Sequence, residues 1–89
     1  MSKHHDLKIE PIFFAEVLAG NKLFEIRRND RDFKKLDTVT LKEYIPRGFL
    51  TASRYTGEEL TFTITYVSTF EQKANWVVFG IKPLHTESK

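Results

Sequence analysis

Glu59 to Val67 reads ELTFTITYV and alternates apolar and polar side chains more regularly than any other stretch of the chain. Period-two alternation rich in threonine and aromatic residues predicts a β-strand with one buried face. The pattern predicts that Leu60, Phe62, Ile64 and Tyr66 point inward and that the three intervening threonines point outward. A sheet with one apolar face should therefore organise the fold.

The segments on either side extend this sheet. Residues 75–82, NWVVFGIK, form a near-continuous apolar run that predicts a strand covered on both faces and ended by Pro83. Residues 38–44, TVTLKEY, alternate again and predict another strand. The stretch 45–58 has no sustained period, so we expect a long loop there, with Gly57 turning the chain back.

The N-terminal part predicts a strand followed by the only convincing helix. Residues 6–10, DLKIE, alternate with their apolar side chains on one face. Pro11 suits the first turn of a helix over residues 11–19, and Gly20 suits a left-handed cap at its end. The apolar face of this helix has the i, i+3, i+4 spacing and consists of Phe14, Val17 and Leu18.

Residues 22–28, KLFEIRR, predict a further strand that leads into a polar loop. Phe24 and Ile26 share one face of this strand, and we expect the opposite face, with Leu23, Glu25 and Arg27, to carry its charges outward. The loop 29–37 contains one anchoring aromatic residue, Phe33. Together the elements predict an α+β fold, a curled or closed β-barrel of about five strands with one short helix plugging an opening.

Composition limits the class of protein. The chain has 89 residues, 40% of them apolar, and we expect one domain over residues 1–89 with an ordered core from about 5 to 83. A net charge of +2 is far below that of proteins that coat nucleic acid nonspecifically. Cysteine is absent and no apolar run approaches the roughly 18 residues that span a bilayer, so we expect a cytoplasmic monomer without a membrane partner.

Metal and cofactor chemistry is not expected. The only histidines are His4, His5 and His85, near the two ends, and neighbouring residues on an extended chain point to opposite faces. No serine sits in a recognisable nucleophile elbow, and the four glycines are isolated rather than grouped in a phosphate loop. We therefore expect neither a metal nor a cofactor.

The basic residues nevertheless gather locally. Six of them lie between positions 22 and 35, opposed by three acidic residues: Lys22, Arg27, Arg28, Arg31, Lys34 and Lys35 against Glu25, Asp30 and Asp32. After the turn at Gly20, Glu25 and Arg27 follow Lys22 on one strand face, with Cα atoms of the pair about 6.6 Å apart. Such a set forms either a cradle for an anion or nucleotide, or ordinary surface salt bridges.

The run GNKLFEIR at positions 20–27 resembles the GxKxxExR signature of ASCH domains, small relatives of the PUA family of RNA-binding barrels. The resemblance extends over HDLKIEP, FEIRRNDRDF, YTGEE and WVVFGIK, and it is closest to a small phage and bacterial branch catalogued as a domain of unknown function. It implies a PUA-like barrel that binds RNA or a nucleotide-like ligand between helix and barrel. Lys22, Glu25 and Arg27 are the matching positions, Arg28 and Arg31 extend the positive surface, and Tyr44 or Tyr55 offers a stacking face.

Two alternatives stay open at this point. One ASCH subfamily is a small amidohydrolase of a modified nucleoside, and Lys22 matches its lysine; in an enzyme of this kind Lys22 and Glu25 would be the catalytic residues. Glu25, however, occupies the position of the subfamily's threonine, and no counterpart of its later glutamate lies between Val67 and Trp76. The other alternative is a protein-interaction module that docks through residues 45–58.

Overall fold

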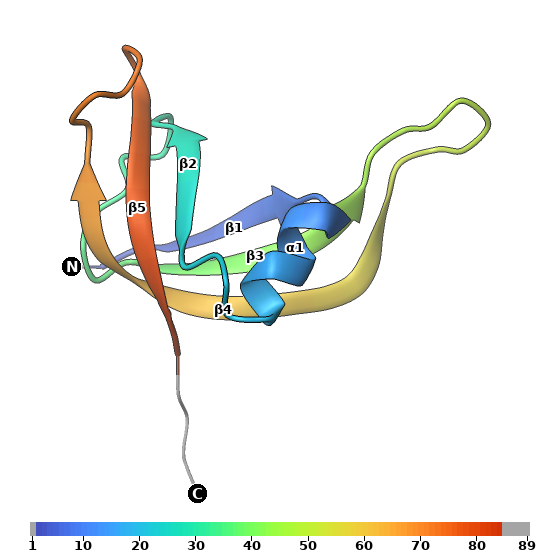
Figure 1. The fold of residues 1–89 in the computed structure, drawn as a ribbon, viewed down its shortest axis with the longest axis horizontal. Helices are drawn as coiled ribbons and strands as arrows, with labels where there is room; N and C mark the ends of the chain where they lie inside the picture. Colours follow the sequence, from blue (N-terminus) through green and yellow to red (C-terminus); the bar gives the residue numbers. More distant parts are fainter. Residues whose placement is uncertain (1, 85–89) are drawn as a thin grey trace, which may run out of the picture.

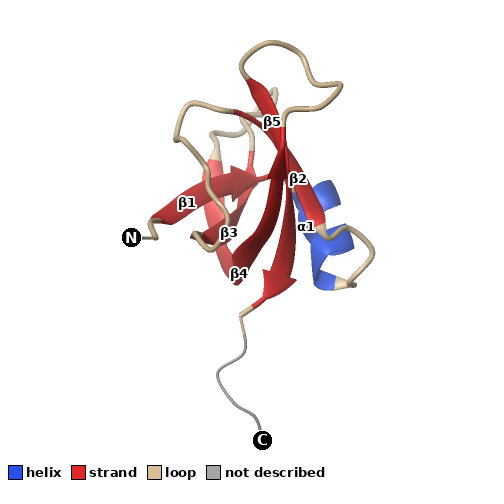
Figure 2. Ribbon diagram, turned by 90° about the vertical axis from the view of Figure 1, so that its left-hand side faces the viewer, coloured by secondary structure: helices blue, strands red, loops and turns tan. Residues whose placement is uncertain are grey.

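Five strands form a single curled sheet in the computed structural model, which describes residues 2–84 (Figures 1 and 2). The sheet order is β1-β3-β4-β5-β2, so β1 and β2 are its two edges. β1 and β3 are parallel, and the other neighbours are antiparallel. The elements in chain order are β1 (His4–Ile9), α1 (Pro11–Leu18), β2 (Phe24–Arg28), β3 (Thr38–Ile45), β4 (Arg54–Ser68) and β5 (Trp76–Pro83).

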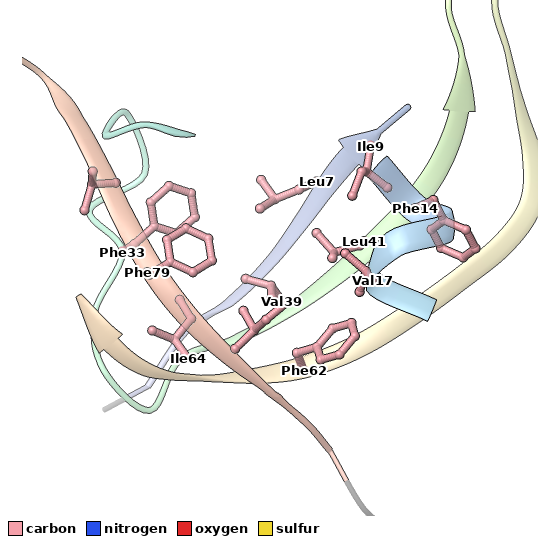
Figure 3. Close-up of a cluster of buried hydrophobic side chains, with 12 residues drawn as sticks. Leu7, Ile9, Phe14, Val17, Phe33, Val39, Leu41, Phe62, Ile64 and Phe79 are labelled. Carbon is pink, nitrogen blue, oxygen red and sulfur yellow. The ribbon is translucent and has the colours of Figure 1, made fainter. Parts of the chain in front are cut away.

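The concave side of the sheet holds the core (Figure 3). Alternate residues of β1 and β3 point into it, as the sequence pattern predicts, and alternate residues of β5 do so as well. Phe14 and Val17 of α1 cover one end of this core, and Phe33 from the polar loop fills the other end against Phe79. Leu18, predicted on the buried face of α1, is instead exposed, because only the narrow Phe14 and Val17 stripe faces the sheet.

An irregularity in β4 reverses the predicted orientation of Tyr66. Phe62 and Ile64 are buried as expected, but the register with β5 shifts between Ile64 and Tyr66. A bulge adds one residue, so the alternation of faces changes beyond it. Tyr66 is consequently 67% exposed, and Val67 packs against the core in its place.

The outer faces of β2 and β5 also differ from expectation. β5 is buried on its inner face alone, and its alternate residues, such as Val78, are half-buried because no helix or strand within residues 2–84 covers the convex side. In β2 the predicted faces are interchanged: Glu25 is buried, whereas Phe24 and Ile26 lie on the exposed side beside β5. Partners for the Glu25 carboxylate explain how a charged residue replaces apolar ones on the inner face.

Residues 45–58 form a loop only in part, because Ile45 ends β3 and residues 54–58 begin β4. β3 and β4 continue past α1 as a projecting hairpin in Figure 1, with Tyr44 opposite Tyr55. Its connecting loop is 46–53. Gly57 does not turn the chain back; it lies inside β4 at φ +96°, where three residues of β4 face Glu43 alone. The left-handed backbone of that bulge suits glycine.

A buried hydrogen-bonded pair, His5 and Asp37, joins the N-terminal strand to the loop before β3. Nε2 of His5 donates to Oδ2 of Asp37 at 2.8 Å, and the backbone N–H groups of Lys3 and Lys34 donate to the same carboxylate at 2.9 and 3.1 Å. Burial raises the pKa of Asp37, but these hydrogen bonds lower it more, so the pKa lies below its ordinary value. The ionised carboxylate is therefore the form that stabilises the fold.

This pair gives the protein a specific acid sensitivity. The unfolded chain, whose Asp pKa is about 3.9, binds protons more readily than the folded one, so the contribution of Asp37 is complete above that pH and is lost as pH falls through the lowered folded pKa. Urea unfolding of the wild type and of Asp37→Asn between neutral pH and about pH 3 measures it. We expect the wild type to lose more stability over this range; parallel losses would contradict the assignment.

Candidate functional site

The candidate site is a groove where the two edges of the curled sheet approach each other. Its volume is about 650 Å³. One wall comes from the end of β1 and the start of α1, and the other comes from β2 with the first residue of β5. The lining residues are Lys8, Ile9, Glu10, Phe13, Lys22, Phe24, Glu25, Ile26, Arg27, Arg28 and Trp76.

The turn after α1 places Lys22 in the groove. Gly20 has φ +83°, the left-handed conformation predicted for the helix cap. The backbone N–H groups of Asn21 and Lys22 both donate to the carbonyl of Glu16, at 2.9 and 3.1 Å, which fixes the chain direction before β2 begins. Lys22 thus enters the groove from its helix end.

Glu25 forms the charged floor of the groove. It is 3% exposed, yet both carboxylate oxygens have a cationic partner. Nζ of Lys22 donates to Oε2 at 2.5 Å, and Nε of Arg27 donates to Oε1 at 2.9 Å. The three charges therefore converge as the spacing predicts. Because the carboxylate is buried, this is more than the exposed salt bridge considered as the alternative.

Two arginines connect the edges of the sheet through side chains. The NH2 group of Arg27 donates to the backbone carbonyl of Lys8 at 2.8 Å, and the NH1 group of Arg31 donates to the carbonyl of Asp6 at 2.9 Å. Asp6 and Lys8 are two residues apart on the edge strand β1, so their carbonyls face the same way. These contacts hold β1 and the β2 segment on opposite sides of the groove.

Aromatic rings flank these charges. Nζ of Lys22 lies 5.0 Å from the ring centroid of Phe24 and also donates to the Phe24 carbonyl at 2.9 Å. The guanidinium of Arg28 lies 5.4 Å from the ring of Trp76. Phe13, 48% exposed on the first turn of α1, contributes a further ring to the wall. The groove therefore combines cationic groups with flat apolar surfaces.

Lys22 and Arg27 keep hydrogen-bond donors that are available to a ligand. Lys22 has three N–H donors, of which two are used within the protein, and Arg27 has five, of which two are used. Four cationic side chains line the groove against two carboxylates. A ligand that presents an anionic or carbonyl oxygen next to a planar ring would match these donors and surfaces.

Some of the residues predicted for the site line the groove and others do not. Lys22, Glu25, Arg27 and Arg28 line the groove. Arg31 lies behind it and contacts β1, while Tyr44 lies at the root of the hairpin, outside the groove lining.

Seven of the eleven lining residues are not among those predicted for the site, and Lys8, Phe13 and Trp76 are the ones that add a cation or a ring from outside β2. Lys8 lies on the polar face of the strand expected at residues 6–10, Phe13 lies off the apolar stripe of α1, and Trp76 lies in the apolar run 75–82. Position in the sequence gives no indication for Lys8 and Trp76, because the curling of the sheet brings β1 near β2, and the pairing of β5 with β2 places Trp76 opposite Arg28. Phe13 could have been found from the sequence, because a large aromatic side chain outside the buried stripe of a short helix indicates an exposed binding surface.

Two classes of feature are missing from the part of the chain that the structure describes. Among residues 2–84, no three histidine, aspartate or glutamate side chains converge in a way that would hold a metal ion, and His85 lies outside this range. No helix within the same residues has the length and apolar character needed to cross a membrane.

Comparison with known proteins gives two matches. A family model described as a domain of unknown function (DUF3850) matches residues 4–81, which include β1 to β4, most of β5 and every lining residue of the groove. A protein of Escherichia phage P2, described as an uncharacterised 12.9 kDa protein in the GpA 3′ region, is 34% identical over 68 residues. That match covers 76% of this chain and 57% of the phage protein.

Proposed function

Because this chain belongs to the DUF3850 family, whose description names no activity, we propose its function from the groove itself: it binds RNA or a nucleotide-like ligand there. The observation that carries the proposal is the buried Glu25 carboxylate, which holds Lys22 and Arg27 in fixed positions between aromatic walls. Fixed cationic donors suit phosphate and carbonyl oxygens, and aromatic faces suit bases.

The proposal assigns a distinct role to each group. Lys22 and Arg27 contact phosphate or carbonyl oxygens through their remaining donors, and Arg28 with Trp76 offers a base both a cation and a ring. Glu25 is buried and each of its oxygens already accepts from a cation, so its role is to hold the two cations rather than to read a base amino group.

The same geometry favours a binder over a hydrolase. A lysine that acts as nucleophile or base needs a free lone pair on its amine. Nζ of Lys22 instead donates to the Glu25 carboxylate and to the Phe24 carbonyl. Among the described residues, Glu10 is the one other acidic residue that lines the groove, and it is exposed rather than buried beside Glu25.

We also propose that the fold is a PUA-like barrel of the ASCH type. A PUA-like, ASCH-like barrel is supported by the GNKLFEIR match at residues 20–27 and by a curled five-stranded sheet with its helix after the first strand. A cytoplasmic location and a monomeric state stay predictions from the sequence.

Arg28→Ala is the direct test, because Arg28 lies exposed on the groove and, unlike Lys22 and Arg27, does not neutralise Glu25. Loss of one charge-assisted contact should weaken binding of labelled single-stranded RNA about 10- to 100-fold in fluorescence anisotropy. Few cations line the groove, so the log-log salt slope should be shallow, about −2 to −3.

Lys35→Ala is the matched control, since Lys35 is an exposed cation outside the groove and its loss changes the net charge equally. It should retain wild-type affinity. If RNA oligonucleotides and nucleotides bind the wild type only in the millimolar range, or if both variants behave alike, the proposal is wrong.

A further inference from the structure

The hairpin that extends β3 and β4 carries a large apolar tip on a narrow stem. Phe49 is 98% exposed and Leu50 is 87% exposed, the two highest values among the large apolar residues of the described chain. In Figure 1 this hairpin projects beyond α1 and away from the body of the protein. We call residues 44–55 the arm.

The arm is positively charged and lacks carboxylates. Arg47 and Arg54 flank the tip, and the arm contains no Asp or Glu. Acidic residues return only at its root, at Glu43 and Glu58. An apolar tip between two guanidinium groups is complementary to a ligand that is anionic along its length and apolar in its side groups, as a nucleic acid strand is.

The arm is also continuous with the groove. Nζ of Lys8, a lining residue of the groove, lies 4.5 Å from the ring centroid of Tyr44. Tyr44 stacks edge-on against Tyr55 across the hairpin, with ring centroids 5.0 Å apart. A cation and two tyrosine rings therefore connect the groove to the stem of the arm.

We propose that the arm is the second half of the binding site and that the ligand is a single strand of RNA several nucleotides long. This inference rests on the proposed function of the groove. The strand passes from the groove across Lys8 and Tyr44 to the tip, where Phe49 and Leu50 contact bases and the two arginines contact phosphates. A lone nucleotide would fill the groove and leave the arm unused.

Other occupants fit the arm less well. A stable protein interface buries about 800 Å² on each partner, and two residues at the end of a thin hairpin offer far less. A membrane-binding element needs a broad apolar face, which a two-residue tip also lacks. A strand of RNA needs only successive small contacts, which the groove, the tyrosine pair and the tip supply in sequence.

The test measures how the affinity for RNA depends on the length of the RNA. We measure anisotropy of a labelled trinucleotide and of an RNA of about twelve nucleotides with the wild type, Phe49→Ser/Leu50→Ser and the control Phe70→Ser. Phe70 is a 78% exposed phenylalanine in the β4–β5 connection, and this connection lies away from the arm in Figure 1. Circular dichroism melts check that all three proteins are folded.

We expect the wild type and Phe70→Ser to bind the longer RNA at least about tenfold more tightly than the trinucleotide, and the tip variant to lose this difference while keeping its trinucleotide affinity. Arg47→Ala/Arg54→Ala should flatten the salt slope for the longer RNA alone, by about 1.4. A length effect that survives in the tip variant overturns the arm proposal alone. Failure of the wild type to bind either RNA overturns the groove proposal.

Two further measurements detect the other occupants. Sedimentation with phosphatidylglycerol vesicles tests for a membrane, and light scattering after gel filtration tests for a second copy. Vesicle binding or a dimer that the tip substitutions abolish, together with an unchanged length effect, overturns the arm proposal in favour of that occupant. Neither behaviour is expected of the wild type.

Discussion

Asp37→Ala should destabilise the protein by about 3 to 5 kcal/mol, the cost of breaking a buried pair at one partner. Asp37 is 2% exposed and accepts from the ring of His5 and from the backbone N–H groups of Lys3 and Lys34. Alanine removes all three acceptor contacts at once and leaves those donors without their partner. Urea unfolding at neutral pH, followed by circular dichroism, measures the loss.

Asp30→Ala is the matched control, because its carboxylate is exposed and its ion pair with Arg31 spans 4.0 Å. That change should cost less than about 0.5 kcal/mol. Adding His5→Ala to Asp37→Ala measures the coupling, and we expect the double variant to lose less than the two single losses together. Additive losses, or an Asp37→Ala variant as stable as the wild type, would contradict a structural role for the pair.

Ile64→Ala should destabilise the protein by about 2 to 5 kcal/mol, since Ile64 is fully buried in the middle of the core. The loss combines the transfer energy of the removed methyl and methylene groups with the cavity that they leave. A decrease in the urea midpoint at unchanged slope would show that the folded state, rather than the compactness of the unfolded chain, is affected.

Tyr66→Ala is the informative comparison, because strict alternation along β4 places Tyr66 and Ile64 on the same face. The register shift between these two residues leaves Tyr66 exposed, so its truncation should cost well below 1 kcal/mol. Equal effects at the two positions would mean that β4 is regular there, and that Val67 does not replace Tyr66 at the core.

Much of the fold follows from the hydrophobic pattern of the sequence. The strands around Val39, Ile64 and Val77 and the helix with Phe14 all form where periodicity predicts them. Alternation is reliable there because each element buries one face against the same core. The prediction that Phe33 anchors the polar loop is also confirmed, since a single large apolar side chain in such a loop is stabilised by burial in the core.

The errors arise where a polar partner or an extra residue overrides that pattern. Glu25 is buried because Lys22 and Arg27 neutralise it, and His5 is buried because Asp37 accepts its hydrogen bond. The two members of the second pair are 32 residues apart in the sequence, so no local spacing reveals them. The bulge at Gly57 likewise turned a strand into an apparent loop.

The sequence predicted part of the candidate site. It did not predict that the central carboxylate, Glu25, is buried rather than exposed. Convergence of Lys22, Glu25 and Arg27 follows from the turn and the strand spacing, and the resemblance to ASCH domains singles out the same positions. Because Glu25 is buried, Lys22→Ala or Arg27→Ala would lower the stability of the fold as well as the affinity for a ligand, since each would leave the buried carboxylate without one of its partners. Loss of binding in those variants would therefore include loss of folding.

The arginine contacts to β1 have a consequence beyond the site. An edge strand exposes main-chain oxygens that invite another chain to extend the sheet, the first step toward aggregation. Arg27 and Arg31 occupy the carbonyls of Lys8 and Asp6 on that edge, and their charge repels a second strand of the same chain. We therefore expect this edge to be less available for pairing with a second strand, although the sheet does not close into a complete ring of backbone hydrogen bonds.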